Sequence, residues 1–113
     1  MTAILNQHEN YLQADQAYGF PLLIKNLLSR AKVVSGDKKI HYVDKTSYTY
    51  HEFFKRVNRL ANVLKGLNLQ KGDVVAVMDW DTHRYLECYF AIPMCGYILQ
   101  TVNVRLSEDK VLY

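Results

Sequence analysis

The sequence has few of the residues and segments that would indicate a secreted, disulfide-rich or membrane-spanning protein. It contains two cysteines, Cys88 and Cys95. If both lie in one helical stretch, two turns separate them by about 10 Å, which is too far for a disulfide. We therefore predict that both are reduced core residues, as in a cytosolic protein.

The sequence also shows no targeting segment and no membrane-spanning segment. The first residues contain neither a basic region nor an apolar one, so a secretory signal is not predicted and we expect a cytoplasmic location. The longest apolar run covers residues 89–99 and is interrupted by Pro93 and Gly96. It is shorter than the roughly 20 residues that a membrane span needs, and no such span is predicted.

Charge and motif content exclude further classes of function. The net charge is +3, from 14 Lys and Arg against 11 Asp and Glu, and this is too mild for a nucleic-acid-binding surface. None of the four histidines is spaced to share a helix face with another, so no metal site is predicted. The sequence has no glycine-rich phosphate loop, no serine in a nucleophile elbow and no cysteine–histidine pair. We predict that this chain carries no catalytic, cofactor-binding or metal-binding residue.

The composition that is present is that of one small globular domain. The chain has 113 residues, half of them apolar and 22% charged. Residues 1–20 are polar without a sustained period and are predicted to form an amino-terminal arm. Residues 21–113 are predicted to form an α/β subdomain, in which a βαβ unit with buried parallel strands accompanies a β-hairpin and amphipathic helices.

The first half of this subdomain has recognisable element boundaries. A helix is predicted to begin at Pro21 and to end at the turn 35–37, and two alternating segments, 39–43 and 47–50, predict a hairpin. Thr49 and Glu52 form a capping box that starts an amphipathic helix of about 15 residues, ending near Gly66. The apolar face of the first helix consists of Leu23, Leu27, Leu28 and Ala31. That of the second consists of Phe53, Phe54, Val57, Leu60, Ala61 and Leu64, opposite Lys55, Arg56, Asn58, Arg59, Asn62 and Lys65.

The second half predicts the βαβ unit. Residues 74–78 form an unbroken apolar run, which is typical of a strand covered on both faces. A helix over 82–94 and a second buried strand over 97–102 follow. Ser107 can cap a further helix, yet the sequence ends two turns later on three apolar residues, so we expect the chain to be a fragment of a longer protein. Within its core we expect Leu60 and Val75.

Asp79-Trp80-Asp81 is the one local feature that suggests a site. It follows the first strand of the βαβ unit, at the edge where open α/β sheets bind ligands. The alternative is structural: Asp81 or Thr82 caps the next helix, and Trp80 packs against a neighbouring element. The nine tyrosines likewise predict core edges and interfaces more readily than a platform for stacking bases.

Several of these segments together resemble a known family. The Asp79-Trp80 pair, the His-Arg-Tyr-Leu-Glu run that begins at His83, and Asn103-Val104-Arg105-Leu106 are similar to the amino-terminal part of fatty-acyl-CoA synthetases. These enzymes belong to the adenylate-forming, AMP-binding superfamily. The matching segments are 48–53, 59–62, 71–93 and 96–107, so the resemblance covers about 21–113. Asp81 stands where Asn is usual, and Glu108-Asp109-Lys110 where relatives tend to have Pro-Glu-Gln.

The resemblance implies a ligase that first joins a fatty acid to the α-phosphate of ATP and then transfers the acyl group to coenzyme A. The full-length enzyme would need ATP, Mg and CoA, together with a phosphate loop, an acidic residue and a lysine that all lie beyond residue 113 in this family. We therefore expect a fragment that binds no cofactor, is inactive alone and forms a homodimer. Two alternatives stay open: an interaction module with a tyrosine-rich face, and a fragment of another adenylate-forming enzyme such as an aryl-CoA ligase.

Overall fold

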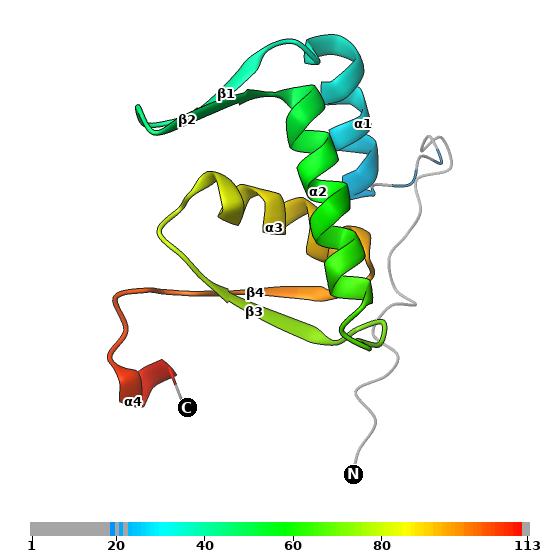
Figure 1. The fold of residues 1–113 in the computed structure, drawn as a ribbon. Coiled ribbons are helices and arrows are strands. Elements are labelled where there is room, and N and C mark those ends of the chain that lie inside the picture. The colour runs from blue at the N-terminus through cyan, green and yellow to red at the C-terminus, as the bar shows by residue number, and fades with distance from the viewer. Residues whose placement is uncertain (1–18, 20, 22, 112–113) are drawn as a thin grey trace.

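The chain folds into two small sheets and four helices, as described by a computed structural model for residues 19, 21 and 23–111 (Figure 1). The predicted arm over 1–20 therefore lies outside the described residues, apart from Gly19. The elements are α1 (Ile24–Ser35), β1 (Lys39–Tyr42), β2 (Thr46–Thr49), α2 (Tyr50–Lys65), β3 (Val74–Met78), α3 (His83–Met94), β4 (Ile98–Val102) and α4 (Glu108–Val111). The α/β class, the hairpin and the βαβ unit are confirmed.

Helix α2 forms where the capping pattern predicts it. The Thr49 hydroxyl accepts a hydrogen bond from the backbone N–H of Glu52 at 3.2 Å, and the helix ends at Gly66. Its apolar face is covered, with Phe53, Val57, Ala61 and Leu64 buried. Leu60, predicted to be a core residue, is half-buried and packs against the edge of this core.

Helix α1 differs from its prediction. Leu28 is buried and Ala31 is half-buried, but Leu23 and Leu27 are exposed. The predicted apolar face is therefore wrong at these two positions. Helix α1 contacts α2 and α3 along a narrow stripe, so only the side chains at the centre of that stripe are covered.

The βαβ unit has the predicted topology with a different burial. Strands β3 and β4 pair in parallel, with Val74 opposite Ile98 and Met78 opposite Val102. The turn into β4 uses Gly96, whose φ of +84° is a backbone conformation that favours glycine. For the described part of the chain, the prediction that both strands are covered on both faces is wrong, because burial alternates along β3 and helices α2 and α3 lie on one side of the sheet (Figure 1). Val75 is consequently half-buried rather than fully enclosed.

The core lies between α2, α3 and the inner face of the β3–β4 pair. Phe53, Val57, Leu28 and Ile92 are its largest fully buried side chains, and the ring of Phe90 meets that of Phe53 edge-on at 5.5 Å. Within the described part of the chain, none of the helices is both long and apolar enough to cross a bilayer.

A partly buried ion pair joins α2 and α3, and the Tyr48 hydroxyl connects the hairpin to it. The Glu87 carboxylate accepts hydrogen bonds from Arg56 Nε at 2.5 Å and from the hydroxyl of Tyr48 at 3.3 Å. Arg56 was predicted to face solvent, but it is half-buried because it lies over the Tyr48 ring and reaches this carboxylate. Burial, followed by the adjacent Glu87 charge, raises the pKa of Tyr48 to about 12. The hydrogen bond with Glu87 raises the pKa of Arg56, so the guanidinium stays charged across the physiological range.

Candidate functional site

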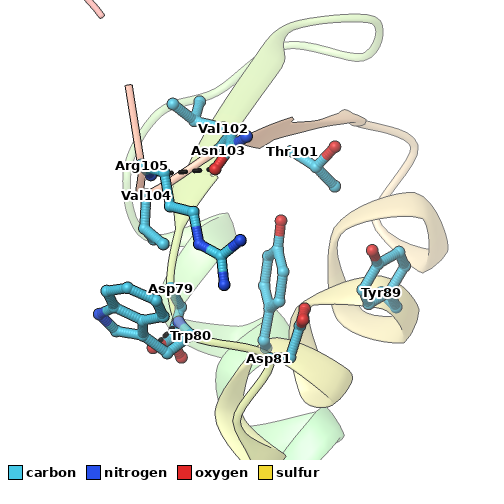
Figure 2. A pocket seen from close by; sticks show the side chains of 10 residues that line it. Asp79, Trp80, Asp81, Tyr89, Thr101, Val102, Asn103, Val104 and Arg105 are labelled. Carbon is cyan, nitrogen blue, oxygen red and sulfur yellow. Dashed lines mark hydrogen bonds between the residues drawn. The ribbon is translucent and has the colours of Figure 1, made fainter. Parts of the chain in front are cut away.

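A cleft opens at the carboxyl ends of β3 and β4, where the sequence places Asp79-Trp80-Asp81 (Figure 2). Its volume is about 450 Å³. It is lined by the loop after β3, by two tyrosines of α3, and by the end of β4 with the loop that follows it. The lining residues are Asp79, Trp80, Asp81, Tyr85, Tyr89, Thr101, Val102, Asn103, Val104 and Arg105. This is the edge at which parallel α/β sheets bind ligands. A cleft therefore lies where the sequence suggested a site.

The loop after β3 is organised by the start of α3. Thr82 is the N-cap: its hydroxyl accepts from the backbone N–H groups of Arg84 and Tyr85, and donates to the Asp79 carboxylate. Asp79 also accepts from the N–H of Trp80 at 2.7 Å. The Thr82 hydroxyl and this N–H hold the pKa of Asp79 below its usual range. Asp79 is thus an ionised structural residue of the helix cap.

The two residues between Asp79 and Thr82 project from this cap. Asp81 has a φ of +41°, in the left-handed region that Asp and Asn adopt more readily than most residues. Trp80 is 65% exposed, so the prediction that it packs against a neighbouring element is wrong. Its indole instead forms one wall of the cleft (Figure 2).

The opposite wall comes from the loop after β4. The side chain of Asn103 accepts a hydrogen bond from the backbone N–H of Arg105 at 2.9 Å, and the Asn103 carbonyl accepts from the N–H of Leu106 at 3.2 Å. These two bonds shape a tight turn. Figure 2 shows the Arg105 side chain extending from that turn toward the Asp79-Trp80-Asp81 loop.

The cleft offers contact surfaces rather than reacting groups. Its lining holds two carboxylates, one guanidinium, aromatic rings and one threonine hydroxyl. The nearest histidine, His83, directs its ring toward Tyr42 and Tyr48, with centroids 5.4 and 5.8 Å away. Across the residues that the structure describes, no three His, Cys, Asp or Glu side chains come together as metal ligands. The lining is mostly polar, and it does not contain a nucleophile paired with a base.

Two of the lining residues could have been anticipated from the sequence. Asn103 and Arg105 follow the second parallel strand directly, and the carboxyl ends of parallel strands lie at one edge of a sheet. Tyr85 and Tyr89 are harder to place, because their spacing of four residues fits any helix face. The sequence analysis named none of these four as site residues.

The cysteines and tyrosines are distributed largely as expected. Cys88 and Cys95 are free and half-buried, and burial raises the pKa of the Cys88 thiol. Among the tyrosines that the structure describes, Tyr48, Tyr85 and Tyr97 are buried and only Tyr89 is exposed. The described surface therefore does not present a tyrosine-rich face of the kind an interaction module would use.

Comparison with known proteins identifies the family. The model of the family described as AMP-binding enzyme matches residues 28–113, which includes α2, the βαβ unit and the cleft. The chain belongs to the AMP-binding enzyme family. Its fold is similar to that of a part of the N-terminal subdomain of NpsA from Klebsiella oxytoca. That match has a TM-score of 0.72 at 22% identity and covers 79% of this chain and 23% of the other.

Relatives by sequence carry the names of both fatty-acid and aryl ligases. The long-chain-fatty-acid–CoA ligase of Thermus thermophilus is 38% identical over 87 residues, covering 77% of this chain and 16% of that protein. The peroxisomal benzoate–CoA ligase of Arabidopsis thaliana is 34% identical over 96 residues, covering 85% of this chain and 17% of that protein. The chain thus spans less than a fifth of the length of these relatives.

Proposed function

We propose that this chain is the amino-terminal part of an ATP-dependent, AMP-forming fatty-acid–CoA ligase. The observation that carries the proposal is the family match over 28–113, which includes the hairpin, α2 and the βαβ unit. The fatty-acid class is supported by the identity of 38% with a relative named for long-chain fatty acids.

The proposed reaction has two steps. The fatty-acid carboxylate attacks the α-phosphate of ATP, which forms an acyl-adenylate and releases pyrophosphate. The thiol of coenzyme A then attacks the acyl carbon and displaces AMP, which leaves a thioester. Transition-state charge in such steps is stabilised by cations and by hydrogen-bond donors held close to the phosphates.

We propose that the groups performing these steps belong to a longer protein, and that the 113 residues are inactive alone. The cleft lining lacks a nucleophile–base pair, and its two carboxylates offset the single guanidinium, so the cleft does not select a polyphosphate by charge. ATP and CoA are accordingly assigned to the longer enzyme. Mg is assigned there too, because the described residues do not assemble a set of acidic metal ligands.

The part of this chain in the longer enzyme would be architectural. Helices α2 and α3 and the inner sheet face form a packed unit that holds the loops after β3 and β4 in place. We further propose a cytoplasmic location and a homodimer for the enzyme, as expected from the sequence. The second candidate function, an aryl-CoA ligase, is favoured by the match to the benzoate–CoA ligase.

Activity assays separate these possibilities. With the product of a longer reading frame that contains these residues, AMP formation should depend on CoA and on a fatty acid, and benzoate should be a poor substrate. Benzoate as the better substrate would replace the fatty-acid proposal with the aryl-CoA alternative. The 113-residue chain assayed in parallel should show only background pyrophosphate exchange, and turnover above background would contradict its proposed inactivity.

A further inference from the structure

One charged side chain is buried in the part of the chain that the structure describes, that of Glu87 on α3. Its Oε1 accepts hydrogen bonds from Arg56 Nε of α2 at 2.5 Å and from the Tyr48 hydroxyl of β2 at 3.3 Å, and its Oε2 accepts from Arg56 Nη2 at 3.5 Å. The Arg56 guanidinium also lies 5.4 Å from the centre of the Tyr48 ring. We call these three residues the Glu87 cluster, and they join the hairpin, α2 and α3 at one point.

Stability alone does not account for the Glu87 cluster. Apolar replacement of a buried ion pair is often neutral or stabilising, because both charges lose hydration on burial. The other buried side chains of α2 and α3 include Phe53, Val57 and Ile92, so apolar side chains at 56 and 87 would fit these surroundings. What the pair adds is direction. A guanidinium that holds a carboxylate through two N–H groups fixes its position and angle, whereas apolar contacts alone are compatible with several arrangements of the two helices.

The Glu87 cluster lies on the side of α3 that faces the hairpin. His83, one turn before Glu87, is on the same side, since residues four apart share a helix face. The His83 ring lies 5.8 Å from that of Tyr48 and 5.4 Å from that of Tyr42, between ring centroids. The rotation of α3 about its own axis is therefore held at two successive turns, by the hydrogen bonds of Glu87 and by the ring contacts of His83.

The opposite side of α3 supplies its part of the cleft. Figure 1 shows α3 between the hairpin and the β3–β4 pair. Tyr85 and Tyr89 of α3 line the cleft at the end of that pair. Each lies two residues from Glu87, and side chains two residues apart on a helix differ by about 200° in direction. A rotation of α3 would consequently move both tyrosines relative to the loop after β4.

The loop 79–81 is tied to the same helix. Thr82, the N-cap of α3, directly precedes His83 and donates a hydrogen bond to the Asp79 carboxylate. Trp80 and Asp81, which also line the cleft, lie between Asp79 and Thr82. The orientation of α3 therefore determines where this wall of the cleft stands.

We propose that Glu87 and Arg56 are positioning residues of the cleft. Their ion pair, completed by Tyr48, fixes the rotation of α3, and through α3 it sets the wall formed by Tyr85, Tyr89 and the loop 79–81. This role concerns the shape of the cleft and is independent of which carboxylic acid the longer enzyme activates.

The test separates the geometry of the cleft from stability by replacing both charges with apolar side chains. In the double variant Arg56→Met/Glu87→Leu no buried charge is left unpaired, so it should melt at a higher temperature than Arg56→Met alone. Trp80 is the only tryptophan, so its indole N–H gives one resonance in an isotope-labelled sample, and it lies in the cleft rather than in the Glu87 cluster. In the double variant this line should split or broaden at least about twofold, because α3 then occupies more than one rotation.

The matched control removes one cation and one carboxylate from the exposed side of α2. Lys55→Met/Glu52→Leu leaves the net charge unchanged, as the test variant does, but alters neither the Glu87 cluster nor the cleft lining, so it should keep the wild-type line. Arg56→Lys is the conservative variant: it keeps a cation beside Glu87 but lacks the fork of two N–H groups. Its Trp80 line should lie between those of the wild type and the double variant.

Each result supports or overturns this role. A split or broadened line in the double variant, with the control unchanged, supports it. The wild-type line in a folded double variant overturns it and makes the pair a contact that serves stability only. Equal broadening in the control also overturns it. If the double variant does not fold, Arg56→Lys decides the question: an intermediate line supports the role, and the wild-type line overturns it.

Discussion

Helix α2 is apolar at half of its positions and strand β3 at all of them, and the fold covers the two elements differently. On α2 most apolar residues share one face, which is covered by α3 and the rest of the core, and Val63 is exposed. On β3 every residue is apolar, and alternate ones are exposed. An amphipathic pattern indicates that one face of the helix must be buried, and for α2 the other elements of this chain bury that face. A continuous apolar pattern is typical of a strand with two covered faces, and the described residues cover one.

The largest expected effect separates these two regions directly. Phe53→Ala on α2 removes a fully buried ring and should lower the free energy of unfolding by about 3–5 kcal/mol. Met78→Ala on β3 should change it by less than about 0.5 kcal/mol, because its side chain is exposed. Urea denaturation of both variants measures the contrast. A cost for Met78→Ala close to that of Phe53→Ala would mean that the outer face of the β3–β4 pair is already covered in this chain.

A somewhat smaller effect is expected at the ion pair between α2 and α3. Arg56→Met leaves the buried Glu87 carboxylate without its cation and should cost about 1.5–3 kcal/mol, reduced from the fully buried case because Arg56 is partly exposed. Lys55→Met on the exposed side of the same helix is the control and should be close to neutral. Equal costs for the two variants would show that the pair contributes nothing beyond a surface charge.

The hydrogen bond between Tyr48 of the hairpin and Glu87 should make the free energy of unfolding depend on pH in the alkaline range. Tyr48 titrates near pH 12 in the folded chain and near pH 10 when unfolded, so its contribution to stability is complete below pH 10. Between pH 10 and 12 the unfolded state loses this proton while the folded state keeps it, which should lower stability by up to roughly 2 kcal/mol. Tyr48→Phe should show a shallower decline over that window, measured as unfolding free energy against pH. Identical slopes would place the Tyr48 hydroxyl in water.

The smallest effect is expected in the cleft. Trp80→Ala should change the free energy of unfolding by less than about 0.5 kcal/mol, because the indole is mostly exposed. Since Trp80 is the only tryptophan, its fluorescence maximum in the wild-type chain should be that of a solvated indole. A blue-shifted maximum or a costly substitution would show that the cleft is packed shut.

Local patterns accounted for the elements and their boundaries. The Thr49 cap and Gly66 delimit α2, and Thr82 starts α3, because capping depends on residues within one turn of the helix end. The apolar run 74–78 predicted a strand. The helix and the second strand that follow it predicted that the two strands pair in parallel. The position of the cleft followed as well, since the loop after β3 had to lie at the carboxyl edge of the sheet.

Burial and long-range pairs were decided only by the tertiary structure. Arg56 and Glu87 are 31 residues apart, and neither local pattern indicates that the two side chains meet. The exposure of Leu23, Leu27 and Trp80 depends on which surfaces α1 and the loop after β3 find beside them, and that is set by how the helices pack. A sequence specifies which side chains avoid water, because that is a property of each residue. Whether they are buried depends on the surfaces that the folded chain packs against them, and the described residues cover only one face of the β3–β4 pair.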